Sequence, residues 1–459
     1  MSRCRWSCLI ALLAASVGHA MAGDHIALVG GTLIDGLGAP PIQDSVVLID
    51  GERITAIGTQ SNLPVPSNYR VISTEGMSVL PGLWDMHVHL MLNGHSDYTH
   101  WDKTYLNRLA DEIMPASAEQ LLLAGVTSAR DLGAPLEASL STRQRIRDGI
   151  IPGPRLFISG PFIQKKPYPG TEAFRWGVAD AKDARRKVQQ LAAAGVDVIK
   201  LIDQDEMSDD EVAAVVDEAH QHQLPVVAHA HRPEEIRIGL KYGVDNFEHT
   251  GLATAPEYPD DVIRAIRERT AQMSKGPLFW TPTVEGLYNY DYVRDHPEAL
   301  DNNCWQRGLK PDTIADIQQS IAHPEQIGYF QITPLRKVTL ARKIEQLRQS
   351  GVVLMIGTDS GIPLKFHCQS TWNELDIWVR VMGISPMEAI RGATWWPAVM
   401  MKQTSDLGSI SVGKYADIVA VKGDVLRYID LLQRVDLVMK SGKVYKLDGA
   451  PVDTATATP

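Results

Sequence analysis

The stretch LPGLWDMHVHL, residues 80–90, bears on both the fold and the functional site of this chain. His87 and His89 stand two residues apart at the end of this apolar run. Side chains at positions i and i+2 of a strand point to the same side, so both imidazoles should face one interior. Buried imidazole nitrogens need polar partners. A hydrogen-bonded pair in the core is one alternative, and a metal site is the other if the rest of the chain supplies further ligands.

Eight short apolar segments follow one another along the chain, and helical patterns separate most of them. One of these helices opens with a capping box formed by Ser208 and Glu211. The eight predicted strands are residues 83–90, 127–132, 155–160, 196–201, 225–231, 246–250, 278–284 and 352–360. This order predicts an α/β fold, a (β/α)8 TIM-like barrel over residues 81–403. A long insertion, residues 285–345, should help to build the binding pocket, because long loops at the catalytic face usually do so.

The two ends of the chain have a different pattern, with short β-rich runs joined by Gly-containing turns. Residues 23–80 and 404–448 together predict one small β-sandwich domain, and residues 449–459 predict a disordered tail. Residues 1–22 have the features of a secretory signal peptide, namely two arginines, a short apolar core and small residues before the expected cleavage site. We therefore expect a periplasmic or secreted protein without a membrane anchor.

Charge and cysteine content limit the classes of partner. The formal net charge of −10, with no clustered basic face, argues against nucleic-acid binding. A small-molecule substrate is the expected partner, and a homo-oligomer is left open. Cys304 and Cys368 are the cysteines that remain after signal-peptide removal. They could pair in an oxidising compartment, both could stay free, or one could line the site, since sequence does not establish proximity.

Polar residues close four further predicted strands at the end of the barrel where active sites lie. These residues are Lys200, His229, His249 and Asp359. Four imidazoles and one carboxylate suit Zn²⁺ or a similar divalent ion. A buried ammonium would be repelled by two cations, whereas a desolvated neutral lysine can react with CO₂ to give a carbamate that bridges two metals. The alternative is a lysine that extends its amine to solvent.

Segments along nearly the whole mature chain resemble the amidohydrolase superfamily. They include LPGLWDMHVHL, GVTSARDLG, AGVDVIKL, VAHAH, FEH and IGTDSG, in this order. The similarity is greatest to the imidazolonepropionase-related and prolidase-like branch. The resemblance implies a binuclear centre in which His87, His89 and Asp359 hold one divalent ion, His229 and His249 hold the other, and carboxylated Lys200 bridges them.

One segment departs from that branch, which often carries Gly-Gly-His after strand three. Here the chain reads GPFIQKKPYPG, residues 160–170, so a prolidase-type specificity is in doubt. Lys165, Lys166 and Tyr168 stand in this segment as candidate substrate-binding residues.

The predicted reaction is hydrolysis of a C–N bond, amide or peptide-like, by a hydroxide that two bridged metals generate. Asp359 should accept the proton and pass it to the leaving amine. His231 should face the same side as His229, where it contacts substrate or holds a neighbouring ligand. His367 is a further candidate for substrate contact. The alternatives are a mononuclear deaminase, a lactone or ester hydrolase on the same scaffold, and a non-catalytic binding protein.

Overall fold

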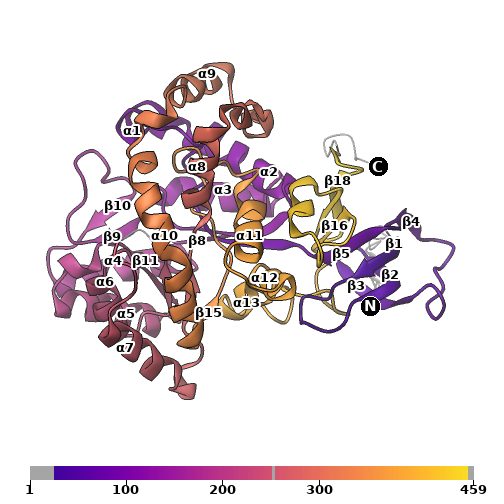
Figure 1. Cartoon of the computed structure of the whole chain (residues 1–459), viewed down its shortest axis with the longest axis horizontal. Helices are drawn as coiled ribbons and strands as arrows, with labels where there is room; N and C mark the ends of the chain where they lie inside the picture. Colours follow the sequence, from indigo (N-terminus) through magenta and orange to yellow (C-terminus); the bar gives the residue numbers. More distant parts are fainter. Residues whose placement is uncertain (1–24, 251–253, 453–459) are drawn as a thin grey trace, which may run out of the picture.

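The computed structural model describes residues 25–250 and 254–452, and these form a barrel with a mixed sheet beside it (Figure 1). The predicted signal peptide and residues 453–459 of the predicted tail lie outside the described residues. Within the described ranges, no helix is long and apolar enough to cross a membrane.

The eight predicted segments form the strands of the barrel. They are β6 (Leu83–Val88), β7 (Val126–Asp131), β8 (Arg155–Ile158), β11 (Ile199–Leu201), β12 (Val226–His229), β13 (Asn246–Glu248), β14 (Phe279–Thr281) and β15 (Val353–Leu354). Neighbouring strands pair in parallel within two groups, β6 to β8 and β11 to β15. Backbone hydrogen bonds close the two seams: Asp197 N–H donates to Ile158 C=O over 2.8 Å, and Met86 N–H donates to Ile356 C=O over 3.0 Å. The predicted fold class is confirmed.

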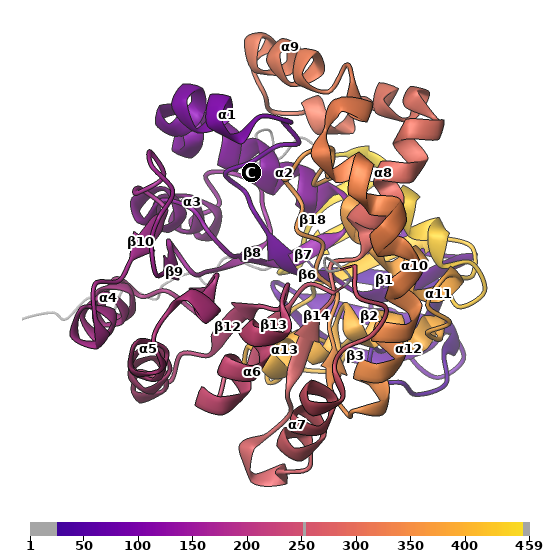
Figure 2. The same cartoon turned by 60° about the vertical axis from the view of Figure 1, so that its left-hand side comes forward.

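Helices surround the strands, as Figure 2 shows. They include α2 (Met114–Leu123), α3 (Leu136–Arg147), α4 (Ala181–Ala194), α5 (Asp209–Gln221), α6 (Pro233–Tyr242), α7 (Asp260–Thr270), α11 (Ser370–Arg380), α12 (Pro386–Gly392) and α13 (Trp395–Met400). The predicted capping box opens α5: Glu211 N–H donates to Ser208 Oγ, and Ser208 N–H donates to the Glu211 carboxylate. Three strands end earlier than predicted, because His89, His249 and Asp359 lie beyond the ends of β6, β13 and β15. Lys200 and His229, in contrast, lie within β11 and β12.

The two chain ends form one mixed sheet. Its strands are β1 (His25–Leu33), β2 (Ile42–Asp50), β3 (Arg53–Thr59), β4 (Arg70–Ser73), β5 (Met77–Pro81), β16 (Ile418–Lys422), β17 (Leu437–Lys440), β18 (Lys443–Leu447) and β19 (Ala450–Pro451). The antiparallel pair of β5 and β16 joins the N-terminal part to the C-terminal part, which lie side by side in Figure 1. Since β19 pairs with β18, the segment predicted as a tail from residue 449 begins with a short strand.

Short elements follow β8 and extend the sheet beyond the barrel. Strand β9 (Phe162–Gln164) pairs with β11 and with β10 (Arg175–Gly177). The turn between β9 and β10 holds the KKPYPG sequence. This excursion therefore stands at the C-terminal end of the barrel, where it can wall a pocket.

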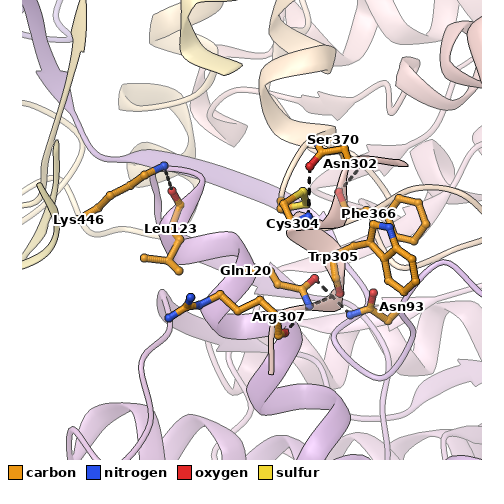
Figure 3. The surroundings of a disulfide bond; sticks show 11 residues. Asn93, Gln120, Leu123, Asn302, Cys304, Trp305, Arg307, Phe366, Ser370 and Lys446 are labelled. Atoms are coloured by element: carbon orange, nitrogen blue, oxygen red, sulfur yellow. Dashed lines mark hydrogen bonds between the residues drawn. A yellow bond between two sulfur atoms is a disulfide. The ribbon is translucent and has the colours of Figure 1, made fainter. Parts of the chain in front are cut away.

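The insertion is largely helical. It contains α8 (Glu285–Asp295), α9 (Pro311–Ser320) and α10 (Gly328–Gln349), and it lies against α1 (Tyr98–Tyr105). Cys304 and Cys368 form a disulfide, so the pairing that the sequence left open is settled. Figure 3 shows its surroundings, in which Gln120 of α2 donates to the carbonyls of Trp305 and Arg307 at 2.7 and 2.8 Å. The disulfide and these hydrogen bonds fix the insertion to the barrel.

Candidate metal centre and substrate pocket

Strand β6 and the segment after β15 meet at the C-terminal end of the barrel. Asp359 N–H donates to His87 C=O over 2.7 Å, and His89 N–H donates to Ser360 C=O over 2.9 Å. Gly357 permits this approach, because a Cβ there would lie 2.3 Å from Thr281 Cγ2 and 2.9 Å from His87 N. As a result, Asp359 Oδ1 lies 3.4 Å from His87 Nε2 and 3.0 Å from His89 Nε2.

A second cluster consists of His229, His231 and His249, from the ends of β12 and β13. In each cluster, one possible ligand atom per residue lies within 4.8 Å of the others. The ring centroids of His87 and His249 are 4.8 Å apart, so the two clusters adjoin. His249 Nδ1 also lies 4.0 Å from Asp359 Oδ2, which places this carboxylate beside both clusters.

Four histidines of the two clusters are held in their neutral form. Burial, with Lys200 as a further contributor, lowers the pKa of His87 and of His229 well below the ordinary value. Burial likewise lowers the pKa of His249, and it lowers the pKa of His231 to about 3. A neutral imidazole offers a lone pair to a metal, whereas an imidazolium does not. His87 Nε2 is buried and has no hydrogen-bond partner among the described residues.

Lys200 lies within β11, and its side chain is fully buried. Its Nζ has no hydrogen-bond partner in the described part of the chain. Burial lowers the pKa of Lys200 to about 8, so about a tenth of the amine is neutral at pH 7. Unpartnered nitrogens in a buried set of imidazoles and one carboxylate fit divalent metal ions, which such ligands bind.

Glu248 and Arg130 support this set, and the sequence analysis did not identify either residue. His87 Nδ1–H donates to Glu248 Oε2 over 2.8 Å, and Arg130 donates to Glu248 Oε1 over 2.6 Å. Arg130 also donates to Met86 C=O over 2.7 Å. With Nδ1 as the donor, the lone pair of His87 is at Nε2, toward Asp359. The available signal was a charged residue inside each of two fully buried strands.

Three residues of the site have an uncommon backbone conformation. His249, Thr283 and Asp359 adopt positive φ values of 77°, 53° and 62°. Such values disfavour residues other than glycine, and a β-branched residue most of all. The His249 ring and the Thr283 hydroxyl are hydrogen-bonded at 2.8 Å, Nδ1 to Oγ1. This conformation lets consecutive strand ends turn their side chains into one space.

A cavity of about 590 Å³ opens above the two clusters. His89, His229, His231, His249 and Asp359 form its floor. Its walls carry aromatic and cationic side chains from α1, the β9–β10 excursion, α8, α10 and the segment after Asp359. These side chains are Tyr98, Lys103, Phe162, Tyr168, Phe174, Arg175, Tyr290, Tyr329, Arg336 and Lys365. The cavity can therefore take an organic molecule with apolar and anionic parts.

The remaining candidates from the sequence lie in different places. Tyr168 lines the cavity, whereas Lys165 pairs with Glu211 at 2.5 Å and Lys166 is exposed, both outside the cavity wall. His367 is buried behind the floor, where its ring bonds to Ser360 Oγ at 2.9 Å and to Leu92 C=O at 3.0 Å. His367 thus positions the segment that carries Asp359.

A third cluster of the same residue types lies farther out, between α1 and α9. It consists of His95, His100 and Asp316. Asp316 Oδ2 is 2.8 Å from His100 Nε2 and 3.6 Å from His95 Nε2, and it accepts the Tyr105 hydroxyl at 2.8 Å. None of the three cluster residues lines the cavity.

Comparisons with known proteins agree with this architecture. Ochratoxinase of Aspergillus niger is 25% identical over 473 residues, covering 91% of this chain and 86% of the relative. Imidazolonepropionase of Alkaliphilus metalliredigens is 22% identical and covers 88% of this chain and 90% of its own length. A solved Xaa-Pro dipeptidase with bound methionine superposes with a TM-score of 0.70 at 23% identity, over 92% of this chain and 100% of the other. The profile of the amidohydrolase family matches residues 78–445, so the chain belongs to the amidohydrolase family of metal-dependent hydrolases.

Proposed function

We propose that this chain is an exported hydrolase that cleaves the C–N bond of an amide or peptide-like substrate. In this proposal, carboxylated Lys200 bridges two divalent ions, and Zn²⁺ is the first candidate. The supporting observation is that two adjoining histidine clusters share one carboxylate, Asp359, beside a buried amine without a partner. The names of the relatives, an ochratoxinase and an Xaa-Pro dipeptidase, are compatible with a C–N bond as the target.

Individual side chains have different roles in this proposed reaction. Divalent ions bound at these clusters would lower the pKa of water and polarise a substrate carbonyl. Asp359 reaches both the histidines and the cavity, so its carboxylate can take a proton from the attacking water and give it to the leaving nitrogen. His231 lines the cavity and stacks on His249 with ring centroids 4.6 Å apart. Since its pKa of about 3 keeps it neutral, His231 can hydrogen-bond to the substrate without adding charge.

Metal content and hydrolysis together test the proposal. The mature protein should hold about two ions per chain and should hydrolyse members of a panel of N-acyl amino acids, dipeptides, aryl amides and lactones. One ion per chain with ammonia release from an amino-substituted ring would instead favour the deaminase. Lactone hydrolysis without amide hydrolysis would favour the ester-cleaving alternative. Export is tested by the N-terminus of the mature protein, which should begin at Gly23.

Lys200 provides the test of the bridge. A neutral amine adds to CO₂ and releases one proton, and the resulting carbamate carries a negative charge where an ammonium would repel cations. Metal-free protein reloaded with Zn²⁺ in bicarbonate-depleted buffer should recover activity slowly, and added bicarbonate should accelerate the recovery. Intact mass under non-denaturing conditions should show the added CO₂ in the wild type and not in Lys200→Ala. An unmodified lysine in an active protein with two ions would contradict the bridge.

A further inference from the structure

Four cationic side chains line the cavity, and they differ in their surroundings. Lys103 is exposed, so water can solvate its amine. Lys365 Nζ lies 3.4 Å from Glu285 Oε2. Arg175 donates to Gln164 Oε1 over 3.1 Å, and its guanidinium packs over the rings of Phe162 and Tyr168. The guanidinium of Arg336 makes no ion pair or hydrogen bond with any residue that the structure describes, and its Nε is buried. Among the described cations of this cavity that are not exposed, Arg336 is therefore the one whose charged group has no hydrogen bond or ion pair within the chain.

Three other cations of α10 have acidic partners, so the lack of a partner for Arg336 results from where its side chain lies. Lys337 Nζ pairs with Asp291 at 2.8 Å, Arg342 with Glu257 at 3.2 Å, and Arg348 with Glu388 at 3.4 Å. Each of these cations meets a carboxylate of the chain itself. Arg336 faces the cavity instead. A partly buried guanidinium with unmet donors costs free energy unless something else supplies the acceptor.

A second donor without a partner lies in the same wall. The Tyr290 hydroxyl is buried and has no hydrogen-bond partner among the described residues. Tyr290 stacks on Tyr329 with ring centroids 5.5 Å apart, and both line the cavity with Arg336. Burial lowers the pKa of Arg336, and the groups that oppose this are the two tyrosines, with no carboxylate among them. This wall thus offers N–H and O–H donors to a group that supplies negative oxygens.

We infer that Arg336 and the Tyr290 hydroxyl bind a free carboxylate of the substrate, while its scissile C–N bond lies at Asp359 and the histidines. This inference rests on the proposed hydrolase function. A planar guanidinium suits a carboxylate because two parallel N–H groups can meet two oxygens. The carboxylate could belong to the amine half of the substrate, as in an N-acyl amino acid, or to the acyl half, as in a half-amide of a dicarboxylic acid.

Two matched pairs of compounds separate these sources. The first pair is N-benzoyl-L-leucine and its primary amide, and the second is N-phenylsuccinamic acid and its primary amide. For one pair, wild-type kcat/KM at the internal amide bond should favour the acid by about 10- to 100-fold, as expected for a hydrogen bond between charged groups. Arg336→Gln should reduce this ratio to about 1, and Arg336→Lys should restore part of it. Lys337→Gln, the matched control, should keep the wild-type ratio.

Binding distinguishes failure of this inference from failure of the proposed function. Calorimetry on metal-loaded Asp359→Asn protein measures Kd for each acid and amide without turnover. At least one acid should bind about tenfold or more tightly than its amide, and adding Arg336→Gln should remove that difference. Equal binding within both pairs, no binding of either acid, or a preference that survives Arg336→Gln would overturn the inference. A protein that binds the acid but hydrolyses nothing would instead contradict the proposed function.

Discussion

Two clusters of histidine and aspartate in this chain share their residue types and differ in chemistry. The inner cluster contains His87, His89 and Asp359, at the C-terminal end of the barrel. The outer cluster contains His95, His100 and Asp316, between α1 and α9. In both clusters, two imidazoles lie within 4 Å of one carboxylate. Residue types and imidazole–carboxylate distances alone therefore do not separate a metal centre from a structural contact.

The difference lies in what satisfies the polar atoms. In the outer cluster, Asp316 receives hydrogen bonds from His100 and the Tyr105 hydroxyl, and the ring of His95 bonds to the backbone of Asp97. The side chain of His100 is 45% exposed, so water can complete its contacts. In the inner cluster, His87 Nε2 and the neighbouring Lys200 Nζ are buried without hydrogen-bond partners among the described residues. Unmet buried donors and acceptors are costly, which indicates that the inner cluster is built for a ligand.

The largest expected effect follows from removing an inner ligand. His87→Ala should lower the bound metal per chain and reduce kcat/KM by at least about 10²-fold, since it deletes a buried imidazole for which the neighbours cannot substitute. Elemental analysis and kinetics on the same preparation measure both quantities. Full metal content with full activity would place the metal centre elsewhere and remove the contrast between the two clusters.

Asp359→Asn should separate metal binding from proton transfer. The amide keeps the size of the side chain and one oxygen, but it does not act as a base near neutral pH. We expect kcat to fall by about 10²- to 10⁴-fold while much of the metal is retained. Near-normal turnover with two ions per chain would show that another group moves the proton.

Glu248→Gln should have an intermediate effect, because Glu248 acts on the metal only through His87. The substitution weakens the contact that fixes Nδ1–H of His87, and we expect metal affinity to fall by about 10- to 100-fold. Competition with a chelator of known affinity measures this change. Glu374→Gln is the matched control: Glu374 is an equally buried carboxylate that bonds to Trp378 and to backbone amides, with no histidine contact. Equal metal loss in both variants would indicate general destabilisation instead.

The difference between the clusters also explains what sequence could and could not predict. His229, His249 and Asp359 each close an apolar run, and a polar residue in that position of a barrel strand faces the site. Glu248 and Arg130 each stand as a charged residue inside a buried strand, which is a local signal, but only the fold brings the two together across the barrel and beside His87. The sequence predicted Lys165 as a substrate-binding residue, but in the fold it pairs with Glu211 of α5, which local sequence does not bring near it.

The role of Arg336 could not be predicted from local sequence either. On a helix with several lysines and arginines, its sequence context is that of a solvated charge. Its neighbour Lys337 has nearly the same context, and only the positions of α8 and α10 give Asp291 to Lys337 and the cavity to Arg336. Local patterns identify residues whose environment is set by their own strand, whereas a missing partner is a property of the assembled fold.

The smallest expected effect belongs to the outer cluster. His100→Ala removes one contact to Asp316, but the Tyr105 hydroxyl still donates to that carboxylate. Because His100 is nearly half exposed, the free energy of unfolding should fall by no more than about 1 kcal/mol, and metal content should stay at the wild-type value. Denaturant unfolding and elemental analysis measure these quantities. His220→Ala is the control, since His220 makes a similar exposed contact to Asp245 at 2.9 Å, away from α1 and α9. Loss of about one ion per chain in His100→Ala but not in His220→Ala would show that the outer cluster is a metal site too, and that its saturated hydrogen bonds rearrange when a metal binds.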